Sequence, residues 1–343
     1  MKILIVKLSS LGDVVHSMPA VQDIRRALPH AQVDWVVERS FAPLVQRCEG
    51  VDHVIGCELR RWRKSPLAAQ TRAEWKSFSD QLRSQAYDAV IDLQGLTKSA
   101  LVARTVRLAP EGRRIAMANR TEGSSYERPT RWVADVAITL PVHVHAVMRG
   151  RELCARALGY AVPDSLRFGL KTGAPGDVGS GAKSHCVALV HGTSRDDKCW
   201  PVEHWLALGR RLLGEGVSLG LPWGSEEERE RAASIAQALG PQAEVWPRMD
   251  LGRLTDRLAA CAGVIGVDSG LSHIAVALDL PHVQIYNFDT AWRTGPLATG
   301  SGHERQVSVY AQPTPTVDAV WQAWTQVRAA PDIQVLQGVQ ASP

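Results

Sequence analysis

The sequence lacks the features that define several protein classes. Its 343 residues contain no run of about 18 apolar residues, so we expect no membrane-spanning segment. The apolar run near the N-terminus is too short for a signal peptide. The six cysteines form no Cys-x-x-Cys pair and no Cys/His cluster with zinc spacing, a pattern typical of a reduced cytoplasmic compartment. No Asp-x-Asp pair occurs, which argues against a metal-chelating nucleotide-sugar site.

An excess of charge of one sign is also missing. The 39 Lys and Arg and 35 Asp and Glu leave a net charge of only +4, whereas a general nucleic-acid binder usually has a larger and more concentrated excess. We therefore expect no nucleic-acid partner. The hydrophobic content of 45% and charged content of 22% are ordinary for a globular protein, and the length suggests about two domains.

Short apolar segments alternate with helical patterns in both halves of the chain. The predicted strands cover residues 2–8, 33–37, 53–56, 88–93 and 113–117, then 186–191, 217–221, 244–246, 264–267 and 282–286. The predicted helices cover residues 14–28, 41–48, 68–84, 97–107, 201–213, 226–239, 251–261, 271–278 and 317–329. This alternation predicts parallel βαβ units.

The predicted fold class is therefore α/β, with two Rossmann-like, doubly wound domains facing each other across a cleft. We place the domains at residues 1–160 and 185–343, joined by a Gly- and Pro-rich linker at 161–184. The last helix belongs either to the second domain or returns to the first. No Gly-x-Gly-x-x-Gly motif follows either first strand, so we do not expect the cleft to bind NAD.

Asp13 follows the first strand, where the chain turns into a helix. A carboxylate at this position can accept a proton from an acceptor hydroxyl, and the helix N-terminus would lower its pKa and make it a weak base that acts late. Alternatively, Asp13 is only a helix cap, with Gly12 serving the turn.

Two loops of the second half have the composition of anion-binding sites. The loop after the strand that ends at His191 contains Thr193, Ser194 and Lys198, which could bind a diphosphate; alternatively it is an exposed turn with Arg195 paired to Asp196. The segment from Gly266 to His273 opens a helix. Its Ser269 and Gly270 can offer backbone N–H groups and its Asp268 can hold sugar hydroxyls; otherwise Asp268 and Ser269 are plain caps and His273 is a packed helix residue.

A basic run, Arg60-Arg-Trp-Arg-Lys64, places four cations around one tryptophan. Such a run suits recognition of carboxylates or phosphates on an acidic substrate, although a solvated charge run is the commoner explanation.

Together these segments resemble glycosyltransferase family 9, and within it the ADP-heptose:lipopolysaccharide heptosyltransferase I group. The matching pieces lie in the family's order over most of the chain: Lys7-Leu-Ser-Ser-Leu-Gly-Asp13, Arg60-Arg-Trp-Arg-Lys64, Tyr87-Asp-Ala-Val-Ile-Asp-Leu-Gln-Gly95, Arg195-Asp-Asp-Lys198, Leu221-Pro-Trp-Gly224 and Val267-Asp-Ser-Gly-Leu-Ser-His273. The resemblance implies a GT-B fold and inverting transfer of L-glycero-D-manno-heptose from ADP-heptose to a Kdo residue of Kdo2-lipid A.

The resemblance also assigns roles to residues. Asp13 would be the general base. The ADP-heptose site would contain Thr193, Ser194, Lys198, Glu228, Met249, Asp268, Ser269, Gly270 and His273. The acceptor site would contain Arg60, Arg61, Arg63, Lys64 and Arg120. Around Arg120 the sequence departs from the family pattern, so either Arg120 or Arg128 could reach the acceptor. No metal and no cofactor are expected.

The basic run and the eleven tryptophans suggest peripheral attachment to the cytoplasmic face of an anionic inner membrane.

Three alternative functions remain: heptosyltransferase II, which uses a heptose acceptor; a nucleotide-sugar 2-epimerase on the same fold; and a two-lobed binding protein. The basic run favours a carboxylate-bearing acceptor and hence the first group. Binding proteins of that last class are usually exported, and no signal peptide is expected here.

Overall fold

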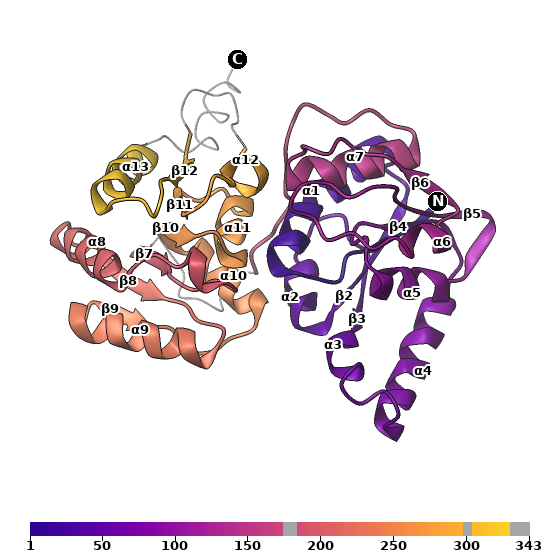
Figure 1. Cartoon of the computed structure of the whole chain (residues 1–343), viewed down its shortest axis with the longest axis horizontal. Coiled ribbons are helices and arrows are strands. Elements are labelled where there is room, and N and C mark those ends of the chain that lie inside the picture. Colours follow the sequence, from indigo (N-terminus) through magenta and orange to yellow (C-terminus); the bar gives the residue numbers. More distant parts are fainter. Residues whose placement is uncertain (174–183, 298–303, 330–343) are drawn as a thin grey trace, which may run out of the picture. The chain divides into compact units, whose positions relative to one another are not determined.

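The computed structural model describes residues 1–173, 184–297 and 304–329. The chain divides into two compact units, Met1–Lys171 and Thr172–Pro343 (Figure 1). Each unit is built around one six-stranded sheet in which all paired strands are parallel. The expected α/β class with two doubly wound sheets is confirmed.

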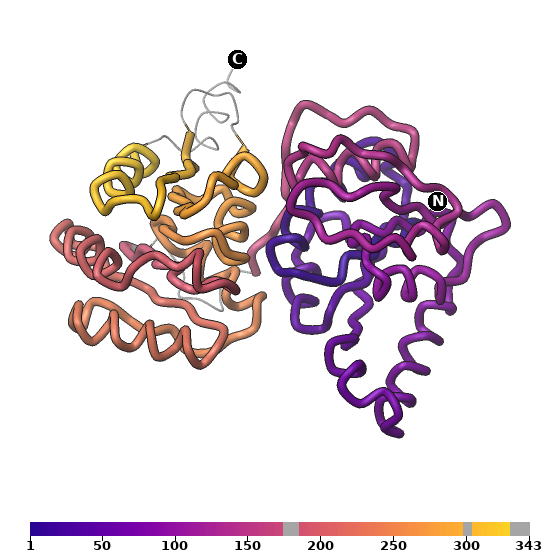
Figure 2. Tube along the Cα trace, in the orientation of Figure 1, coloured from indigo at the N-terminus to yellow at the C-terminus, as the bar shows by residue number. Residues whose placement is uncertain are grey.

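The first sheet has the strand order β3-β2-β1-β4-β5-β6. In chain order its strands are β1 (Lys2–Val6), β2 (Gln32–Glu38), β3 (His53–Cys57), β4 (Tyr87–Asp92), β5 (Leu108–Met117) and β6 (Val136–Ile138). The helices of this unit are α1 (Leu11–Ala27), η1 (Arg39–Phe41), α2 (Ala42–Val45), α3 (Leu59–Trp62), α4 (Ala69–Arg83), α5 (Thr97–Thr105), α6 (Thr130–Val133) and α7 (Ala146–Leu158). The segment with α3 and α4 extends away from the sheet (Figure 2).

The second sheet has the order β12-β11-β10-β7-β8-β9. Its strands are β7 (Ser184–Val190), β8 (Ser218–Leu221), β9 (Ala243–Val245), β10 (Cys261–Val267), β11 (His282–Tyr286) and β12 (Gln306–Tyr310). Its helices are η2 (Asp196–Lys198), α8 (Val202–Gly214), α9 (Glu226–Leu239), α10 (Leu251–Ala259), α11 (Gly270–Ala277), α12 (Ala291–Thr294) and α13 (Val317–Ala329).

Each sheet has one position where the chain reverses the direction in which it adds strands: between β1 and β4 in the first, and between β7 and β10 in the second. The central strands are buried, as their continuous apolar sequences predict. Parallel sheets bind ligands outside the carboxyl ends of the strands at such reversal points. The loops that follow β1, β7 and β10 are therefore the places to look for a site.

Several helices and strands differ from those that the sequence predicts. Helix α1 begins at Leu11, three residues earlier than expected, because Ser10 and not Asp13 caps it. The short helix expected at 41–48 ends at Val45. Strands β6 and β12 and helix α7 were not expected at all. Helix α13 packs on β11, β12 and α8, so the last described helix stays with the second unit.

The expected linker at 161–184 is attached to the first unit over part of its length. The Glu49 N–H donates to the Gly169 carbonyl at 2.7 Å, and the Lys171 N–H donates to the Arg47 carbonyl at 2.9 Å. Residues 174–183 of this segment lie outside the described residues.

Candidate active site

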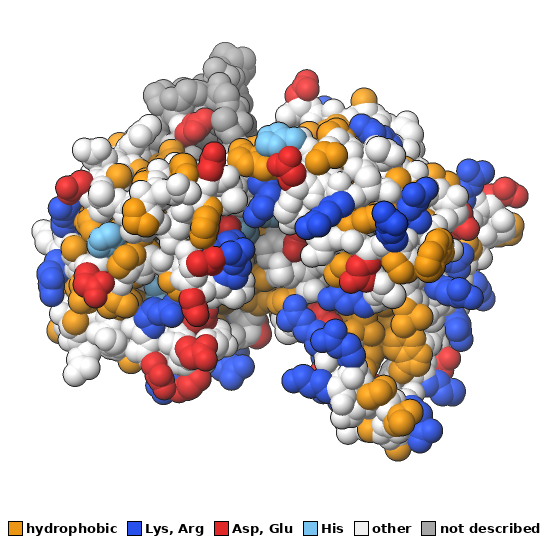
Figure 3. Space-filling model, in the orientation of Figure 1, with side chains coloured by type: hydrophobic (Ala, Val, Ile, Leu, Met, Phe, Trp, Pro, Cys, Tyr) orange, Lys and Arg blue, Asp and Glu red, His pale blue; other side chains and the backbone are white. Residues whose placement is uncertain are grey.

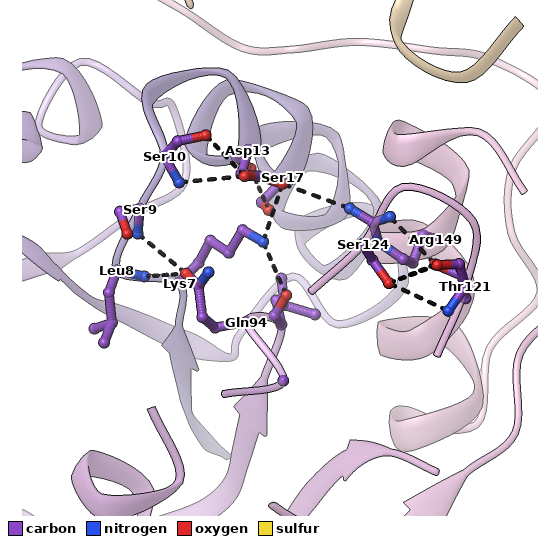
Figure 4. A network of polar contacts seen from close by, with 12 residues as sticks. Lys7, Leu8, Ser9, Ser10, Asp13, Ser17, Gln94, Thr121, Ser124 and Arg149 are labelled. Carbon is purple, nitrogen blue, oxygen red and sulfur yellow. Dashed lines mark hydrogen bonds and ion pairs between the residues drawn. The ribbon is translucent and has the colours of Figure 1, made fainter. Parts of the chain in front are cut away.

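Asp13 occupies the first turn of α1, beside the carboxyl end of β1. The Ser10 backbone N–H and hydroxyl donate to Asp13 Oδ2 at 3.2 and 2.8 Å, as in a capping box. This arrangement leaves Oδ1 directed to other groups (Figure 4). The Asp13 side chain is 34% exposed, so the carboxylate is anchored on one oxygen and remains accessible to a substrate.

Two buried cations face the other oxygen of this carboxylate. Lys7 Nζ lies 3.4 Å from Asp13 Oδ1, and Arg149 Nη2 of α7 lies 3.5 Å from the same atom (Figure 4). The Lys7 and Arg149 side chains are 5% and 9% exposed. Because their charges are largely removed from water, they act on Asp13 with little screening.

Both cations are held in place by further bonds. Lys7 Nζ donates to the Leu93 carbonyl at 3.0 Å, and Arg149 Nη1 donates to Thr121 Oγ1 at 3.3 Å. The Gln94 side-chain oxygen accepts from the Leu8 and Ser9 N–H groups, both at 3.1 Å. Gln94, two residues after the end of β4, therefore holds the loop that leads from β1 to Asp13.

The surroundings of Asp13 decide its protonation state. Burial alone would raise the pKa of its carboxyl, but the positive charges of Lys7 and Arg149, with the Ser10 hydrogen bond, outweigh this effect and hold the pKa well below its usual range. Burial lowers the pKa of Lys7, against the opposing influence of Asp13. Asp13 is thus a carboxylate at neutral pH, and it lines a small cavity together with Lys7, Ser17 and Arg149.

Replacing Arg149 by methionine is expected to raise the pKa of Asp13, because one of its two neighbouring positive charges is removed while much of the side-chain volume is kept. If Asp13 must be ionised for activity, the acidic limb of the pH–rate profile will move to higher pH. Arg149→Lys retains the charge and is expected to restore much of the original profile. An unchanged profile in Arg149→Met would show that Arg149 does not position or tune Asp13.

In the second unit, the loops after β7 and β10 meet at an ion pair. Lys198 Nζ lies 2.5 Å from Asp268 Oδ2, and His273 Nε2 of α11 lies 3.5 Å from Asp268 Oδ1. Thr193 Oγ1 donates to the Asp268 carbonyl at 3.1 Å. Burial would raise the pKa of Asp268, but His273 and Lys198 outweigh it and hold the pKa well below its usual range. The sequence analysis placed these four residues in one site, and the structure brings them together.

The neighbouring polar groups include one without a partner. Ser269 is the N-cap residue of α11, and its hydroxyl oxygen is buried without a hydrogen bond within the described part of the chain. The backbone N–H groups at the start of α11 follow it, including that of Gly270. A buried hydroxyl at a helix N-terminus next to a lysine is a suitable arrangement for a phosphate oxygen.

Glu228 lies beside the loop after β7 and accepts hydrogen bonds from backbone N–H groups. It stands in the first turn of α9, where its Oε2 accepts from the Gly224 N–H at 2.6 Å and the Ser225 N–H at 3.2 Å. A Cβ added to Gly192 would lie 2.4 Å from Glu228 Oε1, so the absence of a side chain at Gly192 lets the loop after β7 lie against Glu228. Glu228 is both a helix cap and a neighbour of the Thr193 loop.

Comparison with known proteins places this geometry in a family. The model of glycosyltransferase family 9 (heptosyltransferase) matches residues 75–320. Lipopolysaccharide heptosyltransferase 1 of Escherichia coli strain K12 is 39% identical over 292 residues, which are 83% of this chain and 88% of that protein. The chain belongs to glycosyltransferase family 9. The expected GT-B fold of this glycosyltransferase is confirmed by the E. coli heptosyltransferase WaaC solved with ADP, with a TM-score of 0.83 and 34% identity over 96% of this chain and all of that one.

The same E. coli enzyme solved with ADP-2-deoxy-2-fluoro heptose is similar to this glycosyltransferase with a TM-score of 0.77 and 34% identity. That match covers 94% of this chain and 98% of that chain. In the family 9 chain described here, no group of three or more His, Cys, Asp and Glu that could hold a metal occurs among the described residues. Within the same residues, no helix combines the length and the apolar character needed to cross a membrane.

For Ser194 and Met249, which were also predicted to bind the donor, the structure gives a position and an exposure. Ser194 is exposed in the loop after β7, and Met249 is half-buried between β9 and α10. The alternative of a purely polar turn is right in one respect: Arg195 is exposed and ion-paired, although its partner is Asp197 and not Asp196.

The basic run forms α3 and the turn after it. Arg60, Arg63 and Lys64 are exposed, and the Arg60 N–H donates to Glu38 Oε1 at 3.2 Å. Arg61 differs, because its guanidinium pairs with Glu58 at 2.6 Å and also with Glu74. Trp62 is buried and donates to Glu74 Oε2 at 2.7 Å. All four cations of the run are thus exposed, and Arg61 in addition joins α3 to α4 through its two carboxylate partners.

Arg120 and Arg128 are both exposed in the segment between β5 and α6, so the structure leaves either one accessible to an acceptor.

The sequence analysis did not select two residues that contact Asp13, namely Lys7 and Arg149. Lys7 was quoted only as part of a motif, although a lysine at the end of a buried strand is unusual and could have drawn attention. Arg149 is 136 positions from Asp13, on a helix that the sequence analysis did not assign. No local pattern indicates that it faces Asp13.

Proposed function

We propose that this protein is an inverting glycosyltransferase that moves L-glycero-D-manno-heptose from ADP-heptose to Kdo of Kdo2-lipid A. The observation that carries this proposal is the ionised, one-third exposed Asp13 carboxylate at the strand-reversal point of the first sheet. The family supports sugar transfer, and the similarity to heptosyltransferase 1 and to WaaC solved with ADP and a fluorinated ADP-heptose supports the donor.

In the proposed reaction, the first unit holds the acceptor and the second unit holds the donor. An acceptor hydroxyl oxygen attacks the anomeric carbon of the heptose while the bond from that carbon to the diphosphate oxygen breaks, and the configuration at the carbon is inverted. Asp13 accepts the hydroxyl proton. Since its pKa is held low, it is a weak base, and proton transfer occurs late, when bond formation has made the hydroxyl acidic.

We propose that the departing ADP is stabilised by Lys198, the Ser269 hydroxyl and the N-terminus of α11. Thr193, Ser194 and Gly270 would supply further donors to the phosphates. Asp268 and His273 would contact the heptose or the diphosphate, while Glu228 and Met249 would lie near the adenosine. These roles are consistent with the contacts that the partly buried Lys198 and the buried His273 make with the buried Asp268, and with the Ser269 oxygen that has no partner among the described residues.

The acceptor side of the proposal rests on charge. The exposed Arg60, Arg63 and Lys64 would face the Kdo carboxylates and lipid phosphates, with Arg61 bracing their helix and Arg120 adding a further contact. Because such an acceptor is a membrane lipid, we also propose peripheral attachment to the cytoplasmic face of the anionic inner membrane.

The direct test is incubation of the purified protein with ADP-heptose and Kdo2-lipid A, followed by mass spectrometry of the lipid. One added heptosyl residue and one equivalent of ADP are expected. A Kdo2-lipid A that already carries one heptose serves as the control acceptor, and its preferred use would favour the heptosyltransferase II activity. Release of free or epimerised sugar without any lipid acceptor would favour the epimerase.

We further propose that transfer needs no metal ion, since cationic side chains and helix N-termini can meet the diphosphate charge. Removal of divalent cations with EDTA is expected to leave the initial rate unchanged within error. Loss of activity in EDTA that is restored by added Mg²⁺ would contradict this part of the proposal.

A further inference from the structure

Three large apolar side chains of the segment from Leu67 to Trp132 are exposed to solvent. Of the eleven tryptophans, all in the described part of the chain, ten are buried or half-buried, whereas Trp132 of α6 is 83% exposed. Leu101 of α5 is 49% exposed, and Leu67 before α4 is 84% exposed. The tryptophan content is therefore mainly a feature of the cores, and Trp132 needs a separate explanation.

Helices α5 and α6 form one surface. They pack against each other, and Glu127, just before α6, accepts hydrogen bonds from the Thr97 N–H at 2.8 Å and from the Thr97 hydroxyl at the start of α5. Leu101 and Trp132 thus project from two helices that are tied together. A tryptophan exposed on such a fixed surface presents an apolar ring and a polar N–H to the same partner.

The chain around this surface is strongly basic. Residues 59–135 contain 15 Lys and Arg against 8 Asp and Glu, a net charge of +7, whereas the other residues contain 24 against 27. The basic character of the protein is thus confined to the segment that carries Leu67, Leu101 and Trp132. In Figure 3, hydrophobic side chains with Lys and Arg near them lie on the visible face of the first unit, most densely over α3 and α4.

This surface is also connected to the loop between β1 and α1, which leads to Asp13. Lys98 Nζ, in the first turn of α5, donates to Ser9 Oγ at 3.2 Å, four residues before Asp13 in the chain. Lys98 and Leu101 are three positions apart, so they lie on neighbouring positions of one helix face. A layer in contact with Leu101 would therefore lie about one helical turn from the Lys98 side chain that contacts the loop before Asp13.

We propose that Trp132 and Leu101 insert into the headgroup region of an anionic bilayer, with the surrounding arginines and lysines binding lipid phosphates. This inference deepens the proposed function and rests on it, because it explains how an acceptor sugar reaches Asp13 while its acyl chains stay in the membrane. Charge decides in favour of a lipid surface: a concentration of positive charge around an exposed tryptophan matches an anionic headgroup layer.

The test uses the full chain and vesicles of phosphatidylglycerol and phosphatidylcholine that contain no acceptor. The double variant Trp132→Ser/Leu101→Ser is expected to partition into the vesicles about tenfold less in a sedimentation assay. Val142→Ser is the matched control, since Val142 is 56% exposed in the same unit but outside residues 59–135, and it is expected to bind as the original protein does. The original protein and the Val142→Ser variant are both expected to bind only weakly to vesicles of phosphatidylcholine alone, which carry no net charge.

A second measurement remains informative if the double variant does not fold. Lipids brominated near the headgroup quench a tryptophan that inserts beside them, and Trp132→Phe is expected to keep vesicle binding while losing most of this quenching. Equal binding by folded Trp132→Ser/Leu101→Ser, or unchanged quenching in Trp132→Phe, would overturn the inference. So would self-association abolished by Trp132→Ser, which would identify a second copy of the chain as the partner.

The outcome can be separated from that of the transfer assay. If heptose transfer fails while vesicle binding depends on Trp132, the proposed function is wrong and the membrane surface stands. If transfer succeeds and binding does not depend on Trp132 or Leu101, only the assignment of this surface fails.

Discussion

Asp13→Asn is expected to lower the turnover number by about 10²- to 10⁴-fold, the usual contribution of a general base. The substitution keeps the shape of the side chain and the cap of α1 but removes the carboxylate that accepts the proton. Affinity for ADP-heptose is expected to stay nearly the same, because the residues that we propose to bind the donor belong to the second unit. Asp13→Ala is likewise expected to lower the turnover number while leaving the affinity for ADP-heptose nearly unchanged.

The matched control is Asp52→Asn. Asp52 is also a carboxylate of the first unit, 36% exposed and 2.6 Å from an arginine, but it lies away from the loop after β1. Its replacement is expected to leave turnover unchanged. Thermal unfolding of both variants shows whether the loss of the negative charge that faces Lys7 and Arg149 destabilises the Asp13 variant. Near-normal turnover in a folded Asp13→Asn protein would remove Asp13 from the catalytic role.

Lys198→Ala is expected to weaken ADP binding and to lower the rate, by about 10²- to 10³-fold in turnover. Lys198 Nζ is the positive group closest to Asp268, and we propose that in the donor complex it also meets the charge that develops on the departing diphosphate. Arg195→Gln is the matched control, because Arg195 is a cation of the same loop that is exposed and paired with Asp197. Its replacement is expected to have little effect.

The double variant Lys198→Ala/Asp268→Asn distinguishes two roles for the lysine. Removing Lys198 alone leaves the buried Asp268 carboxylate without its nearest cation, which by itself costs binding energy or stability. If Lys198 only neutralises Asp268, the double variant will regain ADP affinity and rate. We expect it to remain impaired, since the diphosphate still lacks its cation. Full recovery would contradict the phosphate role.

The local motifs predicted much of the fold and of each half-site. The apolar strands β1, β7 and β10 are recognisable because parallel strands are buried on both faces. The polar residues of the segments that follow these strands must then lie near the carboxyl edge of a sheet, which is why Asp13, Lys198 and Asp268 could be selected. The start of α1 could not be placed so well, because Ser10 and Asp13 are both good capping residues and only the folded backbone shows which one caps.

The sequence by itself determined the fold class, the family and the residue types at the three loop sites, because these depend on short-range patterns and on the order of motifs. Only the tertiary structure decided what surrounds those residues. Arg149 reaches Asp13 because α7 packs on α1, a contact between segments far apart in the chain. Trp132 stays exposed while most tryptophans enter a core, because burial depends on how helices pack on their sheet, which no local pattern encodes.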